Sequence, residues 1–243
     1  MAGSLTREVF LGDMNLHGMG PPPQGFWGLL SEPEQSVLSG LGRTSVFPPG
    51  GTLCVEGDPA THVFILLAGW VKILGVTSEG HQMVLALRGH GDIVGEVAGE
   101  ATGYRTATVQ ATGTVRSLIV GHDKFSSFLD SYPGASRAYR RVVTQRWSDA
   151  ATMLRRRSVT SGAQRLAFLL LDLAGQHGSG TAGGVYVAMP LSQEELASLA
   201  GTSRATVTRA LGNWRQRGLI RTGPRRITIM DLGALRQIAG HRT

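Results

Sequence analysis

Cysteine, long apolar runs and, in half of the chain, lysine are scarce in this sequence, and each scarcity excludes a class of protein. The single cysteine, Cys54, excludes an internal disulfide and any iron–sulfur or zinc site built from four cysteines of one chain. No run approaches the roughly 18 apolar residues of a membrane span, and no basic segment followed by an apolar core marks a signal peptide. We therefore expect a cytoplasmic protein with no membrane partner.

Charge is distributed unevenly along the chain. Residues 1–133 contain 7 Lys and Arg against 12 Asp and Glu, whereas residues 134–243 contain 17 Arg, no Lys and 5 Asp and Glu. A basic half of this kind is the electrostatic footprint of a nucleic-acid-binding module. A GC-rich coding sequence would also favour arginine over lysine, so the composition leaves both explanations open.

The length of 243 residues is enough for two modest hydrophobic cores. Residues 1–25 include the run Pro21-Pro22-Pro23, which cannot form a regular helix or a central strand, and we interpret them as a flexible arm. In the next unit, residues 26–133, short apolar runs alternate with glycine-rich turns from Phe47 to Val120. That spacing predicts a β-barrel or β-sandwich.

Residues 134–160 indicate one long helix, because glycine and proline are absent between Gly134 and Gly162. Apolar residues recur there at helical spacing and form one seam, which consists of Val143, Trp147, Ala150 and Leu154. Residues seven positions apart on a helix can pair with the same seam of a second chain. The seam predicts a homodimer, and packing of the helix on its own domain is the alternative that the spacing leaves open.

Within residues 161–243, a short segment has the signals of two helices around a tight turn. Ser192 and Glu195 form a capping box at the start of the first helix, and Gly201 allows the left-handed backbone that ends it. Ser203 or the residue before it then caps the second helix. The segment is therefore predicted to be a helix-turn-helix.

The second helix of this motif has two distinct faces. Val207, Leu211 and Trp214 share the inner face on a helical wheel. The outer face and its N-terminal edge carry small and basic residues that suit the major groove of DNA, and we predict contacts there from Ser203, Arg204, Ala205, Thr208 and Arg209. Among these, the two arginines are the candidates for bidentate bonds to guanine.

Two short apolar strands follow this helix, with a basic turn between them that contains Arg225 and Arg226. This arrangement has the form of a wing, whose arginines are predicted to contact phosphate. Solvated surface arginines on a small α+β domain are the alternative, but the caps, the turn glycine and the wing all agree with DNA binding.

Together with this motif, several stretches make the chain, from about residue 27 onward, similar to the family of the cyclic-AMP receptor protein and the fumarate–nitrate reductase regulator (Crp/Fnr). They are Glu56–Ala60, Ile65–Lys72, Gly91–Glu96 and Tyr104–Ala107. The resemblance implies an α+β fold with an N-terminal cyclic-nucleotide-binding-like β-roll (jelly roll), a long dimerisation helix and a C-terminal winged helix-turn-helix. It also implies a transcription regulator rather than an enzyme.

The resemblance further implies a ligand site for a cyclic nucleotide in the β-roll. Gly95 and Glu96 would face the ribose, and Arg105 and Thr106 the cyclic phosphate. A small glycine, an arginine counter-charge and a hydroxyl donor are suited to a phosphate. An internal ion pair between Arg105 and Glu96 in an empty β-roll is the alternative.

Two departures from the family pattern concern specificity. Ala150 and Ala151 stand where the family's nucleotide-binding prototype has hydroxyl residues that grip adenine, and alanine cannot bond a base edge. Ala205 stands where the family commonly has a glutamate, so the carboxylate that would accept from cytosine is absent. Both the adenine preference and the operator are therefore expected to differ from the prototype.

The expected partners are double-stranded DNA with an inverted-repeat promoter site, a second copy of the chain, and RNA polymerase. No metal, haem or iron–sulfur cluster is expected. Two other classes stay open: a ligand-independent family member with a degenerate pocket, and a cupin-type metal enzyme with a DNA-binding module. The second would need His62, His81 and His90, which are widely spaced in the sequence.

Overall fold

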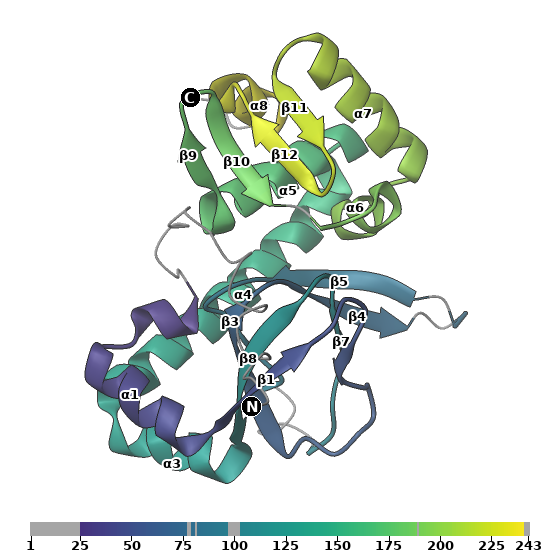
Figure 1. The fold of residues 1–243 in the computed structure, drawn as a ribbon. Helices are drawn as coiled ribbons and strands as arrows, with labels where there is room; N and C mark the ends of the chain where they lie inside the picture. Colours follow the sequence, from purple (N-terminus) through teal and green to yellow (C-terminus); the bar gives the residue numbers. More distant parts are fainter. Residues whose placement is uncertain (1–24, 77–78, 81, 97–102, 189, 241–243) are drawn as a thin grey trace, which may run out of the picture.

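The computed structural model describes residues 25–76, 79–80, 82–96, 103–188 and 190–240. It confirms the predicted α+β fold: a β-rich N-terminal domain, a long helix and a C-terminal domain with a helix-turn-helix and a wing (Figure 1). All of the predicted arm except Gly25 lies outside the described residues.

The N-terminal domain contains two antiparallel sheets that face each other, ordered β1-β8-β3-β6 and β2-β7-β4-β5. A short 3-10 helix, η1 (Phe26–Leu29), and helix α1 (Glu32–Leu41) precede them. The strands are β1 (Arg43–Phe47), β2 (Thr52–Cys54), β3 (His62–Ala68), β4 (Val71–Val76), β5 (Gln82–Arg88), β6 (Ile93–Val94), β7 (Thr108–Ala111) and β8 (Val115–Gly121).

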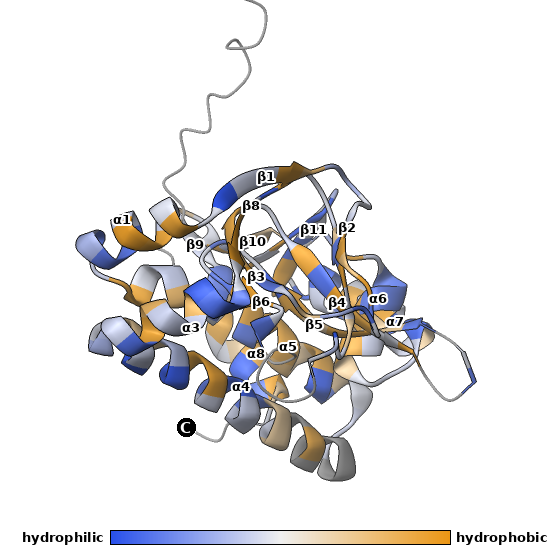
Figure 2. Ribbon diagram, turned by 90° about the horizontal axis from the view of Figure 1, so that it is seen from below, coloured by the Kyte–Doolittle hydropathy of each residue, from blue (hydrophilic) through white to orange (hydrophobic). Residues whose placement is uncertain are grey.

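The sequence of strand β3 is an almost unbroken apolar run because both faces of the strand are buried. Phe64 and Leu66 face the core between the two sheets, whereas Val63 and Ile65 face a second core under the helices. A strand that is buried on one face only would alternate apolar with polar residues instead. In Figure 2 the hydrophobic strands β3 and β8 accordingly lie inside the domain.

Helices α3 (His122–Ser131) and α4 (Pro133–Val159) complete the second core. Phe26 of η1, Phe125 of α3 and Tyr139 of α4 meet edge to face there, with ring centroids 5.7 to 6.4 Å apart. Edge-to-face packing is favourable for aromatic pairs. The first part of α4 is thereby fixed to the N-terminal domain, and its later turns continue toward the C-terminal domain (Figure 1).

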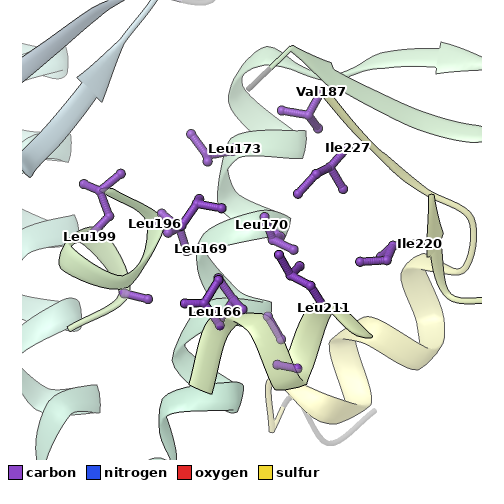
Figure 3. Packing of buried hydrophobic residues seen from close by; sticks show 14 of the residues in the cluster. Leu166, Leu169, Leu170, Leu173, Val187, Leu196, Leu199, Leu211, Ile220 and Ile227 are labelled. Atoms are coloured by element: carbon purple, nitrogen blue, oxygen red, sulfur yellow. The ribbon is translucent and has the colours of Figure 1, made fainter. Parts of the chain in front are cut away.

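The C-terminal domain is built on helix α5 (Gly162–His177), whose first turn is closed by a capping box between Ser161 and Gln164. An antiparallel sheet in the order β11-β12-β10-β9 covers it. The remaining elements are β9 (Ser179–Thr181), β10 (Gly184–Ala188), α6 (Gln193–Ala200), α7 (Arg204–Gln216), β11 (Ile220–Gly223), β12 (Arg226–Ile229) and α8 (Leu232–Ile238). Figure 3 shows leucines of α5 at the centre of this core, between Leu211 of α7 and Val187 of β10.

The β4–β5 hairpin joins the two domains. One face contributes Leu74, Val84 and Leu87 to the core of the C-terminal domain. Trp70, just before the hairpin, stacks edge to face on His177 at the end of α5, with ring centroids 4.4 Å apart. The domain interface therefore includes an apolar part that is continuous with an interior core.

Candidate DNA-binding surface and ligand cavity

Local capping bonds set the geometry of the helix-turn-helix, as the sequence predicts. The Ser192 hydroxyl accepts from the Glu195 N–H, and the Glu195 carboxylate accepts from the Ser192 N–H at 2.8 Å. Gly201 has φ 60° and ψ 44°, the left-handed conformation that ends α6. Of the two candidate caps for α7, Ser203 is the one that bonds, accepting from the Thr206 N–H.

Helix α7 divides into the two faces that the helical wheel predicts. Val207, Leu211 and Trp214 are buried against α5 and α6. The residues predicted to contact DNA are exposed together along the outer face, and they are Ser203, Arg204, Ala205, Thr208 and Arg209. The Thr208 hydroxyl bonds Gln193, the first residue of α6, which sequence reasoning did not single out.

The wing brings a second basic group beside the helix. Arg225, in the turn between β11 and β12, and Arg226, the first residue of β12, are both exposed, and Arg225 adopts a positive φ of 52°. A hollow of about 130 Å³ between the helices and the wing is lined by both of these arginines and by Gln193 and Arg215. The wing arginines thus lie beside Gln193 of α6 and Arg215 of α7.

The N-terminal domain contains a cavity of about 330 Å³ between the β4–β5 hairpin, the loop before β7 and helix α4. The structure brings all four predicted ligand residues to its lining, namely Gly95, Glu96, Arg105 and Thr106. From α4 the lining includes Val143, Trp147 and Ala150, three members of the predicted seam. A cavity of this size is within the range of small-molecule sites.

Arg105 is the charged centre of this cavity. Its side chain is buried, with Nη1 donating to the Gly95 carbonyl at 3.0 Å and Nη2 to the His62 carbonyl at 2.8 Å. Among the described residues, its Nε is buried without a hydrogen-bond partner. Gly95 has φ 81°, and a Cβ there would lie 2.5 Å from Arg105 Nη1, so only glycine fits beside the guanidinium.

Glu96 is paired with an unpredicted residue. Its carboxylate accepts a short bond from Arg146 of α4, rather than one from Arg105. Arg146 also donates to the Ile93 carbonyl at 2.8 Å. The alternative of an Arg105–Glu96 ion pair is therefore wrong: the two carbonyls occupy Arg105, and α4 supplies the cation for Glu96. The sequence signal that was available is the position of Arg146, one residue before Trp147 of the seam.

Burial governs the titration of two groups near the cavity. Burial raises the pKa of the Cys54 thiol above its ordinary value, and the nearby Arg105 charge opposes that shift. Burial and the Arg105 charge both lower the pKa of His62. Both groups are therefore held toward their neutral forms, and Arg105 provides the positive charge that an anion would meet.

Within the part of the chain that the structure describes, no group of three or more His, Cys, Asp or Glu side chains is placed to hold a metal ion. His81 of the cupin-type alternative lies outside the described residues. The helices in the described ranges also include none that is long and apolar enough to cross a membrane.

The seam of α4 differs in burial along its length. Val143 is half-buried against the second core. Trp147 and Leu154 are 74% and 65% exposed, and Ala150 is exposed as well. Packing of the helix on its own domain therefore buries the start of the seam only. Trp147 and Ala150 line the cavity but, like Leu154, stay largely exposed in a single chain.

An exposed recognition helix and wing on one domain, joined by a long helix to a β-roll with a charged cavity, define a DNA-binding regulator. The cyclic nucleotide-binding domain family matches residues 44–132, and the Crp-like helix-turn-helix domain family matches residues 164–238. A CRP-like cAMP-activated global transcriptional regulator of Mycobacterium tuberculosis is 32% identical over 207 residues, which are 84% of this chain and 92% of that protein. The chain therefore belongs to the Crp/Fnr family of transcription regulators, which are not enzymes.

Two further relatives are similar over nearly their whole length. A cyclic AMP receptor protein of Thermus thermophilus is 27% identical over 214 residues, 88% of this chain and 95% of that protein. FixK2 from Bradyrhizobium japonicum shares the fold, with a TM-score of 0.72 at 18% identity over 83% of this chain and 99% of that chain. Membership of this family replaces the cupin-type alternative.

Proposed function

We propose that the protein is a homodimeric, sequence-specific regulator whose DNA affinity is controlled by a cyclic nucleotide in the β-roll. The observation that carries the ligand assignment is the buried side chain of Arg105, which belongs to the cavity lining and whose Nε has no partner among the described residues. A buried donor without a partner costs about 1 to 3 kcal/mol, and an anionic ligand would remove that cost.

The other lining residues are suited to a cyclic nucleotide. Gly95 allows a phosphate to approach the backbone, and Thr106 is exposed with a hydroxyl available as a donor. Glu96 can accept from a ribose hydroxyl. Arg146 of α4 donates to this carboxylate, so a ligand bound at Glu96 would also change a contact of the dimer helix.

The base is expected to be held differently from the family prototype. Ala150 lines the cavity but has no group that can bond a base edge. The wide apolar surface from Ile73, Val143 and Trp147 favours stacking and burial of a base instead. The name of the M. tuberculosis relative makes cyclic AMP the first nucleotide to test.

Dimerisation follows from the exposed part of the seam. Trp147 and Leu154 are large apolar side chains on one face of α4, and an aromatic anchor in an apolar stripe is typical of an interface. A two-fold axis along paired α4 helices would present two copies of α7 to an inverted-repeat site, about 34 Å apart. The proposal divides the chain into a sensor (26–133), a dimer helix (134–160) and a DNA-binding domain (161–243).

The proposed regulator acts on promoters, with RNA polymerase as its partner. The bacterial chromosome lies in the cytoplasm, which is therefore the proposed location. The predicted DNA contacts are the exposed residues of α7 and the wing arginines described above.

Calorimetric titration of the full chain with cyclic AMP, cyclic GMP and a cyclic dinucleotide tests the ligand assignment. We expect one of them to bind, and Arg105→Ala to weaken binding about 10- to 150-fold, the equivalent of a charge-assisted bond of about 1.5 to 3 kcal/mol. Arg116→Ala, on the exposed side of β8, is the matched control and should leave affinity unchanged. Unaltered affinity in a folded Arg105→Ala variant would place the ligand elsewhere.

A ligand-independent regulator is the second candidate, and the Arg146–Glu96 ion pair favours it. This pair already neutralises the carboxylate that would meet a ribose and fixes α4 against the β-roll without a ligand. Absence of binding by the whole nucleotide panel, together with tight specific DNA binding, would support this candidate.

A further inference from the structure

The hydroxyl of Thr208, on the outer face of α7, makes two hydrogen bonds within the protein. Its Oγ1 lies 2.6 Å from Gln193 Oε1 and 3.0 Å from the Arg204 carbonyl oxygen. Gln193 belongs to the other helix of the motif, and all three residues are exposed. The bond to Gln193 thus joins the two helices of the motif on the side predicted to face DNA.

A threonine hydroxyl has one proton and two lone pairs. Both neighbouring oxygens are acceptors, so the single proton is shared between them. If the Gln193 amide were turned so that its nitrogen met the hydroxyl, the proton would still be directed at the Arg204 carbonyl. In either arrangement the hydroxyl has no proton left for a base and retains a lone pair that can accept.

We propose that Gln193 is a positioning residue that holds the Thr208 hydroxyl in place as an acceptor toward DNA, so that Thr208 reads the exocyclic amino group of an adenine or a cytosine. These amino groups are the donors that bases present in the major groove, whereas guanine O6 and N7 and thymine O4 are acceptors. The inference rests on the proposed role of α7 as the reading helix, and it assigns one base class to one position of the half-site.

An acceptor at Thr208 complements the other side chains on the outer face of α7. Arg204 and Arg209 can only donate, so they are suited to guanine. Ala205 has no polar group, and it leaves the neighbouring surface open for a base edge. Thr208 is then the acceptor that completes this set of side chains.

Selection of binding sites from a randomised duplex pool first locates the position that Thr208 reads. Wild type and Thr208→Val should select half-sites that differ at one position, because valine keeps the shape of threonine and removes its hydroxyl. In the wild-type site that position should contain adenine or cytosine on the strand that Thr208 faces.

Base analogues then identify the atom. Replacing the adenine by purine, or the cytosine by pyrimidin-2-one, removes the amino group and should weaken wild-type binding about tenfold, since each chain of a dimer loses one bond. The same analogue should leave the affinity of Thr208→Val unchanged. A 7-deaza purine at the same base pair removes an acceptor instead, and it should affect the two proteins equally.

Variants of Gln193 test its positioning role. Gln193→Leu removes the bond that holds the Thr208 hydroxyl in place across the motif, while the Arg204 carbonyl still accepts its proton. The hydroxyl is then less well placed to accept, and the tenfold discrimination between amino and deleted-amino sites should shrink to about twofold. Gln193→Glu keeps an acceptor and should preserve the discrimination, although its negative charge lowers affinity for all duplexes. A purely structural role for Gln193 would change affinity but would not change this ratio.

The proposal is overturned if the 7-deaza analogue, rather than the deleted amino group, couples to Thr208, or if Thr208→Val selects the same sites as wild type. Site selection with the Arg209→Ala variant distinguishes an error in this inference from an error in the proposed role of α7. If the Arg209→Ala variant also selects the wild-type sites, α7 does not read DNA, and the proposed function is wrong as well.

Discussion

Lys72 of β4 donates to the Glu195 carboxylate of α6 across the domain interface, with Nζ and Oε1 2.7 Å apart. The same hairpin also bonds Ser198 of α6, since the Val84 N–H donates to the Ser198 hydroxyl at 2.9 Å and the Val84 carbonyl accepts from it at 3.4 Å. Its opposite face lines the ligand cavity through Ile73 and Ala86. One two-stranded element therefore contacts both the cavity and the first helix of the helix-turn-helix.

Lys72→Met should loosen this contact and lower the free energy of unfolding by about 1 kcal/mol or less, because the paired side chains are still about one fifth exposed. Chemical denaturation measures the change. Lys124→Met, on the exposed surface of α3, is the matched control and should have no effect. An equal loss in both variants would contradict a specific role for the Lys72–Glu195 pair.

The same pair should respond to acid. Burial acts to raise the pKa of Glu195, but the bonds from Lys72 and Ser192 outweigh it and hold the pKa below its ordinary 4.5. The resulting stabilisation is present above pH 4.5 and is lost as the pH falls through the lowered pKa. Denaturation curves at several acidic pH values should therefore show a smaller acid-dependent loss in Lys72→Met than in wild type.

The dimer interface is tested at Trp147. Trp147→Glu would place a charge in an apolar seam and should weaken self-association by about 2 kcal/mol or more, roughly 30-fold in dissociation constant. Analytical ultracentrifugation over a concentration series measures this. Ser148→Glu adds the same charge at an exposed position outside the seam and should leave the dimer intact. A wild type that stays monomeric at tens of micromolar would contradict the interface, since stable oligomers associate below that range.

Substitution of the helix arginines and of the wing arginines should change DNA binding in different ways. Arg209→Ala or Arg204→Ala should cost about 1 to 3 kcal/mol on the specific site and relax preference at one position of each half-site. Arg225→Ala or Arg226→Ala should instead weaken all sequences alike and reduce the slope of log affinity against log salt by about 1 per lost phosphate contact. Titration against cognate and scrambled duplexes at several salt concentrations distinguishes the two. Equal losses on both duplexes for the helix variants would show that the reading helix is wrongly assigned.

Unfolding should take up protons near neutral pH because of a buried histidine. Burial lowers the pKa of His177 below its ordinary 6.5, with Arg88 and His90 adding to the shift and Asp92 opposing it. The folded state keeps the ring neutral while the unfolded state protonates it, so stability falls as the pH drops through 6.5. His177→Gln should reduce proton uptake on unfolding by up to about three quarters of a proton at pH 6, and by almost none at pH 8. Stability curves of both proteins over this pH range give the uptake, and an unchanged slope would contradict the assignment.

Local sequence patterns were sufficient to predict the helix-turn-helix of the C-terminal domain. The Ser192–Glu195 capping box, the left-handed Gly201 and the buried Val207 side depend on residues three or four positions apart, and helix geometry fixes such neighbours. The same reasoning could have found α1, which begins with a capping box between Ser31 and Glu34 but was not predicted.

Contacts distant in sequence were decided by the tertiary structure alone. Glu96 meets Arg146, 50 residues away, and Lys72 meets Glu195, 123 residues away. The sequence determined the helix-turn-helix and the exposed basic face of α7, because each depends on spacing within one segment, and the family resemblance indicated four residues of the cavity wall. Sheet pairing and domain docking determined which charges are partners and left Arg105 Nε unpaired, because these depend on how whole elements pack together.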